Sequence, residues 1–555
     1  MADDFFSPAW RRRALARAAE DLVDVAVVGG GITGAGIARE AALRGLSVVL
    51  LERGDFASGT SSRSSKLIHG GVRYLAQGDV GLVREAARER AVLRRIAPHL
   101  ARPTTMLIPA RSTRGRLKLS AGLWAFARLA GRDAEAGHRV LDRSEALEAE
   151  PLLRDDRLAG AVTFTEFATD DARLTLETVM SAATAGALAA NYAEVTGGRD
   201  GAAGICLDAV DRTTGESLEV RARVVVNASG PWLDEVAGRL GDGGGRTLEL
   251  TRGIHLVFPA SRIPVRHSVV LPAPDGRSAF IVPAGDVVYA GTTDTLYDGD
   301  PAEPGVDSAD AAYLLEALAA VLRDPPAAGE AIGVWSGVRP LVRQPGKAPS
   351  EISRRDEIRV GPGPRVAIAG GKLTTYRKMA ERVVARVVDL LGGSGSRADT
   401  SEVALVGGGA AEQQAARARA PELPDRRLCE RLWATYGARA EDLIRRVAAD
   451  PNAAERIGGI EELTAAEIEY FVTREMALTV DDVLRRRSRV AMFDGERATA
   501  VAGAVAEQLA RYPGCAAWAA CPQEAWTEMR SRELAAVRAA GAAGTAAPGG
   551  GRRHG

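Results

Sequence analysis

The residues best suited to chemistry begin near the N-terminal end, within the stretch from residue 24 to residue 55. Gly29, Gly31 and Gly34 form a G-x-G-x-x-G pattern, and Glu52 follows about twenty residues later. Glycines at these positions allow a tight turn, close approach of the backbone to a diphosphate, and close packing of a helix on a strand. The carboxylate of Glu52 could bind a ribose hydroxyl. The pattern favours a dinucleotide site over a simple phosphate turn, without choosing between NAD and FAD.

The segment after Glu52, residues 54–79, is dense in glycine, serine and basic residues. The hydroxyls of Ser61 and Ser62 could solvate phosphate, and Lys66 and His69 add donors. An exposed Gly/Ser turn is the alternative interpretation. Because a strand, turn and helix precede it, we expect this segment to face the ligand.

Two later turns also follow short apolar runs. Asn227 and Gly230 lie after a buried strand, where ligands bind in open α/β sheets, although Asn227 could equally be an isolated turn residue. Residues 365–391 repeat strand, Gly-Gly turn and long helix, and Lys372 and Thr374 stand at that helix N-terminus, which favours anions. The chain is therefore expected to return to the ligand at least twice.

The elements that position these residues define an α/β fold. Apolar runs flanking the first glycine turn predict a Rossmann-like nucleotide-binding domain, and the β-branched runs of residues 246–345 predict an antiparallel, β-rich second domain. Capping signals after residue 400 predict a C-terminal helical cap domain. The expected units are a lead-in helix (1–20), a nucleotide-binding domain within 21–395 (segments 21–95, 165–245 and 350–395) interleaved with the second domain (96–164 and 246–349), the cap domain (400–525) and a disordered Ala/Gly-rich tail (530–555).

Composition excludes several classes of protein. Lys plus Arg equals Asp plus Glu at 72 each, so no overall field favours nucleic acid. The four cysteines form no C-x-x-C pair, which argues against a metal site, an iron-sulfur cluster or a disulfide framework and favours a reducing compartment. The sequence contains no apolar run long enough to span a membrane. Its first 22 residues contain acidic residues and no apolar core, so we expect a lead-in helix there and not a secretory signal, with an arginine-rich transit peptide as the alternative.

Residues 111–132 combine six basic residues with leucines, Trp124 and Phe126. Basic and bulky apolar groups on one helix suit an anionic membrane surface. An ordinary surface helix that covers a core is equally compatible with this segment.

Seven motifs, in this order, resemble those of the FAD-dependent glycerol-3-phosphate dehydrogenases of the respiratory, aerobic type. The resemblance covers residues 20–530, and SKLIHGG, SGVRPL and GGKLTTYR are its most specific parts. The motifs are GGGITGAGIAREAALRG, TSSRSSKLIHGGVRYL, TDDARL, NASGPW, AGTTD, SGVRPL and GGKLTTYRKMAE.

The resemblance implies a flavoprotein that oxidises sn-glycerol 3-phosphate to dihydroxyacetone phosphate and passes electrons to quinone. It implies a cytoplasmic protein on the inner face of the cell membrane, bound to the anionic surface, and leaves a homodimer open. Gly29, Gly31, Gly34 and Glu52 would hold the ADP half of FAD; Ser61, Ser62, Lys66 and His69 would approach the flavin; Gly371, Lys372, Leu373 and Thr374 would meet the flavin ring; and Arg73, Tyr74, His255, Arg339, Arg354 and Lys372 would contact the substrate.

The chemistry of the reaction fits these residues. A phosphate tail needs several cations in a concave site, which the arginines and Lys372 supply. The hydroxyl proton needs an acceptor, and His255, or a hydroxyl polarised by Arg339 or Lys372, could meet that need. Three alternatives remain: an oxidase of the same fold that reduces oxygen with glycerol 3-phosphate or an amine as donor, a flavin-folded binding or RNA-modifying protein, and a subunit of an iron-sulfur complex, which the missing cysteine pairs disfavour.

Overall fold

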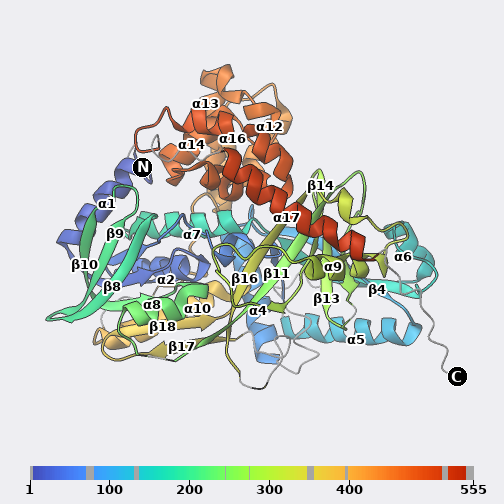
Figure 1. The fold of residues 1–555 in the computed structure, drawn as a ribbon, viewed down its shortest axis with the longest axis horizontal. Coiled ribbons are helices and arrows are strands. Elements are labelled where there is room, and N and C mark those ends of the chain that lie inside the picture. Colours follow the sequence, from blue (N-terminus) through green and yellow to red (C-terminus); the bar gives the residue numbers. More distant parts are fainter. Residues whose placement is uncertain are drawn as a thin grey trace.

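The computed structural model describes residues 4–70, 80–130, 137–243, 245–273, 275–344, 346, 355–393, 398–515 and 523–544. These residues form two β-sheets, the helices that cover them, and a C-terminal helical domain that lies above the sheets in Figure 1. The predicted fold class is confirmed: a parallel nucleotide-binding sheet, a mostly antiparallel second sheet and a C-terminal helical domain.

The first sheet contains eight strands, which are β1 (Leu22–Val28), β2 (Val48–Leu51), β7 (Leu188–Ala190), β8 (Ala193–Gly201), β9 (Gly204–Asp211), β10 (Ser217–Asn227), β17 (Asp356–Val360) and β18 (Arg365–Gly370). Their order is β17-β18-β10-β1-β2-β7, and β9 joins β8 to the first half of β10. The centre is parallel, because β1 pairs in parallel with both β10 and β2, and β10 pairs in parallel with β18. The carboxyl ends of these strands therefore meet at one edge.

Both faces of the first sheet are buried, which explains the apolar run from Val25 to Val28 in β1. Val25 and Val27 belong to a core shared with three helices, while Ala26 and Val28 belong to a core on the other face, shared with the N-terminal helix and with β8 and β9. The helices are α2 (Ile32–Leu43), α7 (Asp171–Thr184) and α10 (Tyr376–Leu390) on the first face, and α1 (Pro8–Glu20) and α8 (Leu233–Arg239) on the second.

The second sheet contains ten strands, which are β3 (Leu67–Ile68), β4 (Arg102–Ala110), β5 (His138–Leu141), β6 (Gly160–Ala168), β11 (Leu248–Pro259), β12 (Ser268–Pro272), β13 (Ser278–Ala284), β14 (Val287–Gly291), β15 (Thr295–Leu296) and β16 (Gly333–Val342). The order is β15-β11-β14-β13-β12-β4-β6-β3, with β16 on β11 and β5 on β6. Among the described strands of this second sheet, only β12 and β4 pair in parallel. Strand β3 lies here although the sequence placed residues 21–95 in the first domain, because Leu67 and Ile68 pair with β6.

The helices beside the second sheet or between the sheets include α4 (Val80–Ile96), α5 (Thr113–Ala130), α6 (Arg143–Ala149) and α9 (Ser308–Ala319). The C-terminal domain has its own apolar core. Its helix α14 begins with a capping box formed by Thr464 and Glu467, one of the capping signals expected after residue 400. The domain comprises α11 (Ala410–Arg419), α12 (Arg426–Tyr436), α13 (Ala440–Ala449), α14 (Ala465–Glu475), the π-helix η9 (Asp482–Arg487), α15 (Val490–Phe493) and α16 (Gly495–Leu509).

The structure differs from the sequence prediction near the C-terminal end. Helix α17 (Gln523–Gly544) occupies part of the segment where a disordered tail was expected from residue 530. Leu534, Val537 and Ala540 lie on one side of α17 and are buried in the core beneath the second sheet. The Ala/Gly-rich composition of this segment predicted disorder although these three apolar residues are spaced along one side of a helix. Residues 545–555 of the expected tail lie outside the described residues. None of the described helices is both long and apolar enough to span a bilayer.

Candidate functional site

The turn between β1 and α2 accepts only glycine at two positions. Gly29 has a φ of +112°, and a Cβ there would lie 2.6 Å from the carbonyl oxygen of Ala228. A Cβ on Gly34 would lie 1.9 Å from the carbonyl oxygen of Gly29. Helix α2 begins after Gly31, which has no side chain to cap the helix. The missing side chains thus bring the helix N-terminus against the strand and leave room for a ligand beside its N–H groups.

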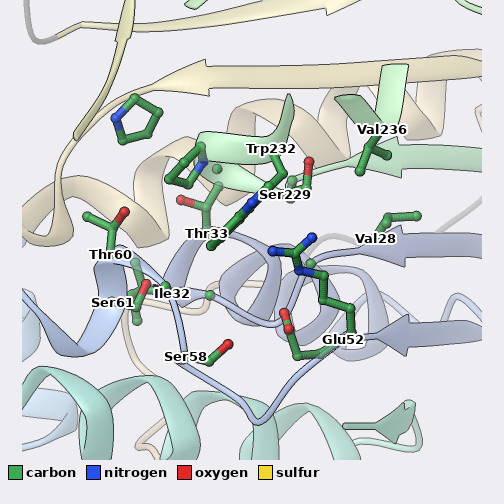
Figure 2. Close-up of a pocket in the computed structure, with 18 of the residues that line it drawn as sticks. Val28, Ile32, Thr33, Glu52, Ser58, Thr60, Ser61, Ser229, Trp232 and Val236 are labelled. Atoms are coloured by element: carbon green, nitrogen blue, oxygen red, sulfur yellow. Dashed lines mark hydrogen bonds between the residues drawn. The ribbon is translucent and has the colours of Figure 1, made fainter. Parts of the chain in front are cut away.

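A cavity, here called the glycine cavity, lies at the carboxyl ends of β1, β10 and β18. Its walls include the turns after these strands, residues 228–232 and 370–373 among them, and the loop around Ser58 and Ser61 (Figure 2). Ligands bind at this edge of open α/β sheets. The predicted cofactor residues that line it are Gly29, Gly31, Glu52, Ser61, Gly230, Gly371 and Leu373.

Glu52 connects the glycine turn to the loop that follows β2. Its carboxylate accepts hydrogen bonds from the backbone N–H groups of Gly30 (2.6 Å) and Gly54 (2.7 Å). Burial raises the pKa of Glu52, and these two bonds oppose that rise. The carboxylate therefore holds the shape of the site and also lines the cavity. Its predicted contact with a ribose hydroxyl stays a prediction.

Ser61 reaches the same helix from the other side. Its Oγ accepts a hydrogen bond of 2.9 Å from the N–H of Ile32, in the first turn of α2. The hydroxyl therefore satisfies one N–H group at the helix N-terminus. Figure 2 shows Ser61 and Ile32 close together at the cavity wall.

Arg53 and Trp232 are cavity residues that the sequence reasoning missed. The Arg53 guanidinium lies 4.2 Å from the centre of the Trp232 ring, and both side chains line the glycine cavity. Trp232 ends the NASGPW motif and Arg53 directly follows Glu52, so both positions stood beside predicted residues. Their stacking joins two turns that are far apart in the sequence, which no local pattern could indicate.

A second cavity, here called the arginine cavity, adjoins the first. Thr60, Ser64, Lys372 and Leu373 line both. The other walls come from residues 63–69, from β11 and β16 of the second sheet, and from Thr374. The charged or titratable side chains that line it are Arg63, His69, His255, Arg339 and Lys372. The structure thus brings together all three predicted catalytic residues at the junction of the two sheets.

His255 lies on β11 and stacks on Trp335 of the neighbouring β16, with ring centres 4.5 Å apart and planes 11° apart. Its Nε2 is 2.9 Å from the Oγ of Ser65, and its Nδ1 has no hydrogen-bond partner among the described residues. Burial lowers the pKa of His255 well below its usual value, and the charges of Arg339 and Lys66 lower it further. The imidazole is therefore neutral at physiological pH and able to accept a proton.

Arg339 is held in one orientation by the loop after β14. Its guanidinium donates hydrogen bonds to the carbonyl oxygen of Thr293 (3.0 Å), to the Oγ1 of Thr292 (2.8 Å) and to the carboxylate of Asp294 (3.2 Å). It passes over Gly253, where a Cβ would lie 2.4 Å from its Nη2. About a quarter of the side chain, 26%, remains exposed. The side chain lines the arginine cavity in this orientation.

Two further cavity residues carry lowered pKa values. Burial and the charge of Lys372, with a smaller effect of Arg90, lower the pKa of His69 to about 3, so this ring is also neutral. Burial and the neighbouring Arg485 lower the pKa of Arg63 to about 10, which still leaves it charged. Arg63 donates to the carbonyl oxygen of Ala302 (2.9 Å). The sequence reasoning missed Arg63, although it stands in the SSRSS stretch that drew attention.

Four predicted cofactor residues line neither cavity: Gly34, Ser62, Lys66 and Asn227. The ammonium of Lys66 is buried against Asp171 (2.7 Å) and the carbonyl oxygen of Ser62 (2.9 Å). The amide of Asn227 donates to the carbonyl oxygen of Leu233 and accepts from Ser229, so it stabilises its own turn. Gly34 packs the helix on the strand. These four residues shape the loops around the cavities.

Three predicted substrate positions, Arg73, Tyr74 and Arg354, lie outside the described residues.

Comparison with known proteins agrees with this geometry. Residues 24–374 match the family described as FAD dependent oxidoreductase, and residues 398–518 match the C-terminal domain of alpha-glycerophosphate oxidase. The chain belongs to the FAD-dependent oxidoreductase family.

Within the family, the chain is similar to aerobic glycerol-3-phosphate dehydrogenases. It is 38% identical over 515 residues to that of Staphylococcus haemolyticus (88% of this chain and 90% of the relative), and 37% identical over 513 residues to that of Bacillus subtilis (89% and 92%). The crystal structure of the Bacillus halodurans glycerol-3-phosphate dehydrogenase complexed with FAD superposes with a TM-score of 0.76 at 32% identity, and the match covers 96% of this chain and 99% of that one.

The glycine cavity fits the family's cofactor, FAD. A Cβ on Gly29 would collide with the turn after β10, so that wall is bare backbone, and a helix N-terminus lies beside it, as a diphosphate requires. Glu52 and Ser61 supply polar atoms at one side, and residues 370–373 bring a second helical turn, η5 (Leu373–Thr375), to the boundary with the arginine cavity. These residues would hold FAD, and the arginine cavity would lie beside it.

Proposed function

We propose that the protein oxidises sn-glycerol 3-phosphate to dihydroxyacetone phosphate with FAD as the hydride acceptor, and that a membrane quinone takes the electrons. The observation that carries the proposal is the arginine cavity, where Arg63, Arg339 and Lys372 lie beside a neutral His255. Several cations in a concave site suit a phosphate tail, and guanidinium groups match its geometry. The names of the curated relatives support the same substrate.

The residues of the arginine cavity have separate roles in this proposal. The cations hold the phosphate, which fixes the orientation of the carbon skeleton. The imidazole of His255 takes the proton from the C2 hydroxyl, because it is neutral and buried. FAD, held in the glycine cavity, would supply the acceptor for the C2 hydrogen, which leaves as a hydride while the C2–O bond becomes a carbonyl. Arg339 or Lys372 polarising that hydroxyl is the second route for proton removal that we retain.

An oxidase that uses oxygen is the second candidate. The match of the C-terminal domain to that of alpha-glycerophosphate oxidase favours this candidate. The two candidates share the substrate and differ only in the electron acceptor. An amine substrate is disfavoured, because one carboxylate needs a single clamp and the arginine cavity contains three cations.

Rapid mixing of the FAD-loaded protein with sn-glycerol 3-phosphate under anaerobic conditions tests the substrate. We expect bleaching of the flavin absorbance by sn-glycerol 3-phosphate, and much slower bleaching by glycerol, which lacks the phosphate. Equal rates with the two alcohols would contradict phosphate recognition. Re-oxidation of the bleached protein by a quinone analogue, and separately by air, then distinguishes the dehydrogenase from the oxidase.

We further propose that α5 lies on an anionic membrane surface. Leu117 and Trp124 are 61% and 55% exposed, and the Arg128 guanidinium lies 4.8 Å from the centre of the Trp124 ring. On the opposite side of the helix, Leu123 and Phe126 are buried. Figure 1 shows α5 along the lower edge of the molecule, away from the C-terminal domain. The outward face thus combines apolar and basic groups, as interfacial helices do.

Vesicle flotation tests this surface. Reversing Lys118 and Arg128 to Glu should lower binding to anionic vesicles at least roughly tenfold, since each basic residue near such a surface contributes about 1 kcal/mol. The matched control reverses Arg12 and Arg17, which are exposed on α1 at the other end of the molecule. Equal loss in both double variants would show that only net charge matters. Light scattering on the same samples tests for a homodimer.

A further inference from the structure

We propose that the C-terminal helical domain positions the cofactor loop, residues 52–61, and that Arg486 and Arg487 do so through Asp55. This inference concerns FAD binding and does not depend on which substrate the protein oxidises. Arg486 and Arg487 end the π-helix η9, and neither lines the glycine cavity or the arginine cavity. They would therefore act as positioning residues.

Asp55 is the point of contact between the loop and the domain. Its carboxylate accepts hydrogen bonds from Arg487 Nη1 (2.7 Å) and Nη2 (3.1 Å) in a bidentate pair, and from Arg486 Nε (2.6 Å). Asn191 donates a further bond of 3.1 Å to it. The side chains of Asp55, Arg486 and Arg487 are no more than 5% exposed. A bidentate, charge-assisted pair of this kind fixes orientation as well as distance.

The rest of the domain holds the two arginines in place. Arg487 also donates to the carbonyl oxygen of Glu475, at the end of α14, with a bond of 2.7 Å. Arg486 also pairs with Asp481 (2.7 Å) and Asp482 (2.6 Å). Burial opposes the charge on Asp55, but Arg487 and Arg486 outweigh it, so the pKa of Asp55 lies below its usual value. Asp55 is therefore ionised, and it is paired with both arginines.

The cofactor loop transmits this contact to the glycine turn. Tyr192 donates from its backbone N–H to the carbonyl oxygen of Gly54 (2.7 Å), and Ala57 donates to that of Gly30 (3.1 Å). At either end of the loop, the Glu52 and Ser61 side chains bond the N–H groups of Gly30 and Ile32. Asp55 thus stands in the middle of a loop that contacts the glycine turn at three points. Loss of its partners would free that loop next to the cofactor.

A buried carboxylate without its cations is costly, so the loop should move to solvate Asp55 when an arginine is removed. The effect should appear in FAD affinity before it appears in the fold of the domain. Energetic coupling between two sites typically changes the affinity for a ligand by about fivefold to 150-fold. This coupling is reciprocal, so bound FAD should also strengthen the contact between η9 and Asp55.

The first experiment measures the dissociation constant of FAD from the full-length protein by the recovery of flavin fluorescence on release. Arg487→Gln should raise this constant by about tenfold or more, and Arg487→Lys should rescue part of the loss because it restores the charge without the fork. The matched control is Arg431→Gln. Arg431 forms a bidentate pair with Glu467 at 2.6 Å inside the same domain, away from the cofactor loop.

The control should lower the thermal midpoint of the domain and leave the FAD constant within twofold of wild type. An Arg487→Gln protein that binds FAD as tightly as wild type would overturn the proposal. Equal loss of affinity in Arg431→Gln would overturn it too, because the effect would then follow domain stability alone.

A second measurement on the wild-type protein covers the case in which Arg487→Gln does not fold. Amide hydrogen exchange is compared before and after FAD is stripped. We expect faster exchange after stripping in residues 54–61 and also in residues 482–489, which do not line the glycine cavity. Faster exchange confined to residues 54–61 would overturn the coupling.

Discussion

The glycine cavity and the arginine cavity share four residues but are built in different ways. One wall of the glycine cavity is backbone: a turn in which a Cβ at Gly29 or Gly34 has no room, with a helix N-terminus beside it. The arginine cavity depends on long charged side chains, such as Arg339, which is held by residues 292–294 of another segment. The glycine cavity therefore requires residues without side chains in its turn, whereas the arginine cavity requires long side chains in fixed orientations.

This difference predicts how each cavity responds to mutation. Adding one methyl group should damage the glycine cavity, because the interfering atoms are backbone and cannot rotate away. Removing side-chain atoms should damage the arginine cavity, because charge and geometry are both lost. Cofactor binding and catalysis should therefore separate between the two sets of variants.

Gly34→Ala should have the largest effect. The new methyl group would lie 1.9 Å from the carbonyl oxygen of Gly29, so the turn must open, at a cost of about 3 kcal/mol or more, and FAD binding should be lost. Flavin absorbance of the purified protein measures this. Gly238→Ala is the control, since nothing lies within 4 Å of its Cβ position in α8. Tight FAD binding by Gly34→Ala would show that the backbone wall adapts.

His255→Asn should lower kcat by about 100-fold or more with FAD still bound, because a general base contributes roughly 10² to 10⁴ in rate. The substitution replaces the imidazole by a shorter amide that cannot act as a base and leaves the backbone of β11 unchanged. Steady-state kinetics and the flavin spectrum of the same sample measure the two effects. A kcat within threefold of wild type would assign proton removal to a hydroxyl polarised by Arg339 or Lys372.

Arg339→Ala should lower kcat/KM for glycerol 3-phosphate by about 100-fold, as expected when one charged partner of a buried anion is removed. FAD affinity should stay within about twofold, which separates the two cavities. Arg262→Ala is the control, because Arg262 pairs with Asp324 and Glu330 in the same domain, away from the cavity. A loss of less than about threefold, under 1 kcal/mol, would remove Arg339 from the substrate site.

Arg53→Ala tests whether any side chain matters in the glycine cavity. The stacking of its guanidinium on Trp232 is worth about 0.5 to 1 kcal/mol at a partly exposed position, so FAD affinity should fall by about twofold to fivefold. Fluorescence titration measures the change. A loss comparable with that of Gly34→Ala would remove the contrast between the cavities.

The pH dependence of kcat gives the smallest expected effect. The pKa of His255 lies well below 6.5, so the base stays neutral as the pH falls from 8 to 6, and kcat should lose its proton acceptor only at lower pH. The profile of kcat is the right measure, because ionisation of the free substrate phosphate does not enter it. An acid limb with an apparent pKa near 6.5 would contradict a buried, neutral His255.

The glycine cavity was largely predictable because its determinants are local. A strand, a glycine turn and a helix occupy about thirty consecutive residues, and the positions of Gly29, Gly34 and Glu52 follow from the turn they form. The alternation of Val25 to Val28 between two buried faces likewise follows from the period of a strand. Such features repeat in any chain with this pattern, so sequence alone predicts them.

The arginine cavity was predicted less completely because side-chain direction depends on distant partners. Lys66 and Arg63 are cations three residues apart in one loop. The ammonium of Lys66 pairs with the buried Asp171, while Arg63 lines the arginine cavity and its guanidinium donates to the carbonyl oxygen of Ala302. Asn227 was predicted to bind the cofactor, and in the structure its amide donates to the carbonyl oxygen of Leu233 in its own turn. His255 gains its stacking partner, Trp335, only when β16 pairs with β11 in this register.

The sequence by itself determined the fold class, the glycine turn and the candidate set of cations, because backbone conformation and strand or helix period are set by neighbouring residues. Only the tertiary structure decided which cations face the arginine cavity, why His255 is neutral, and that Arg486 and Arg487 reach Asp55 across more than four hundred residues. The physical reason is the range of the forces. Turn geometry is decided within a few bonds, whereas burial and charge pairing exist only once the chain has folded.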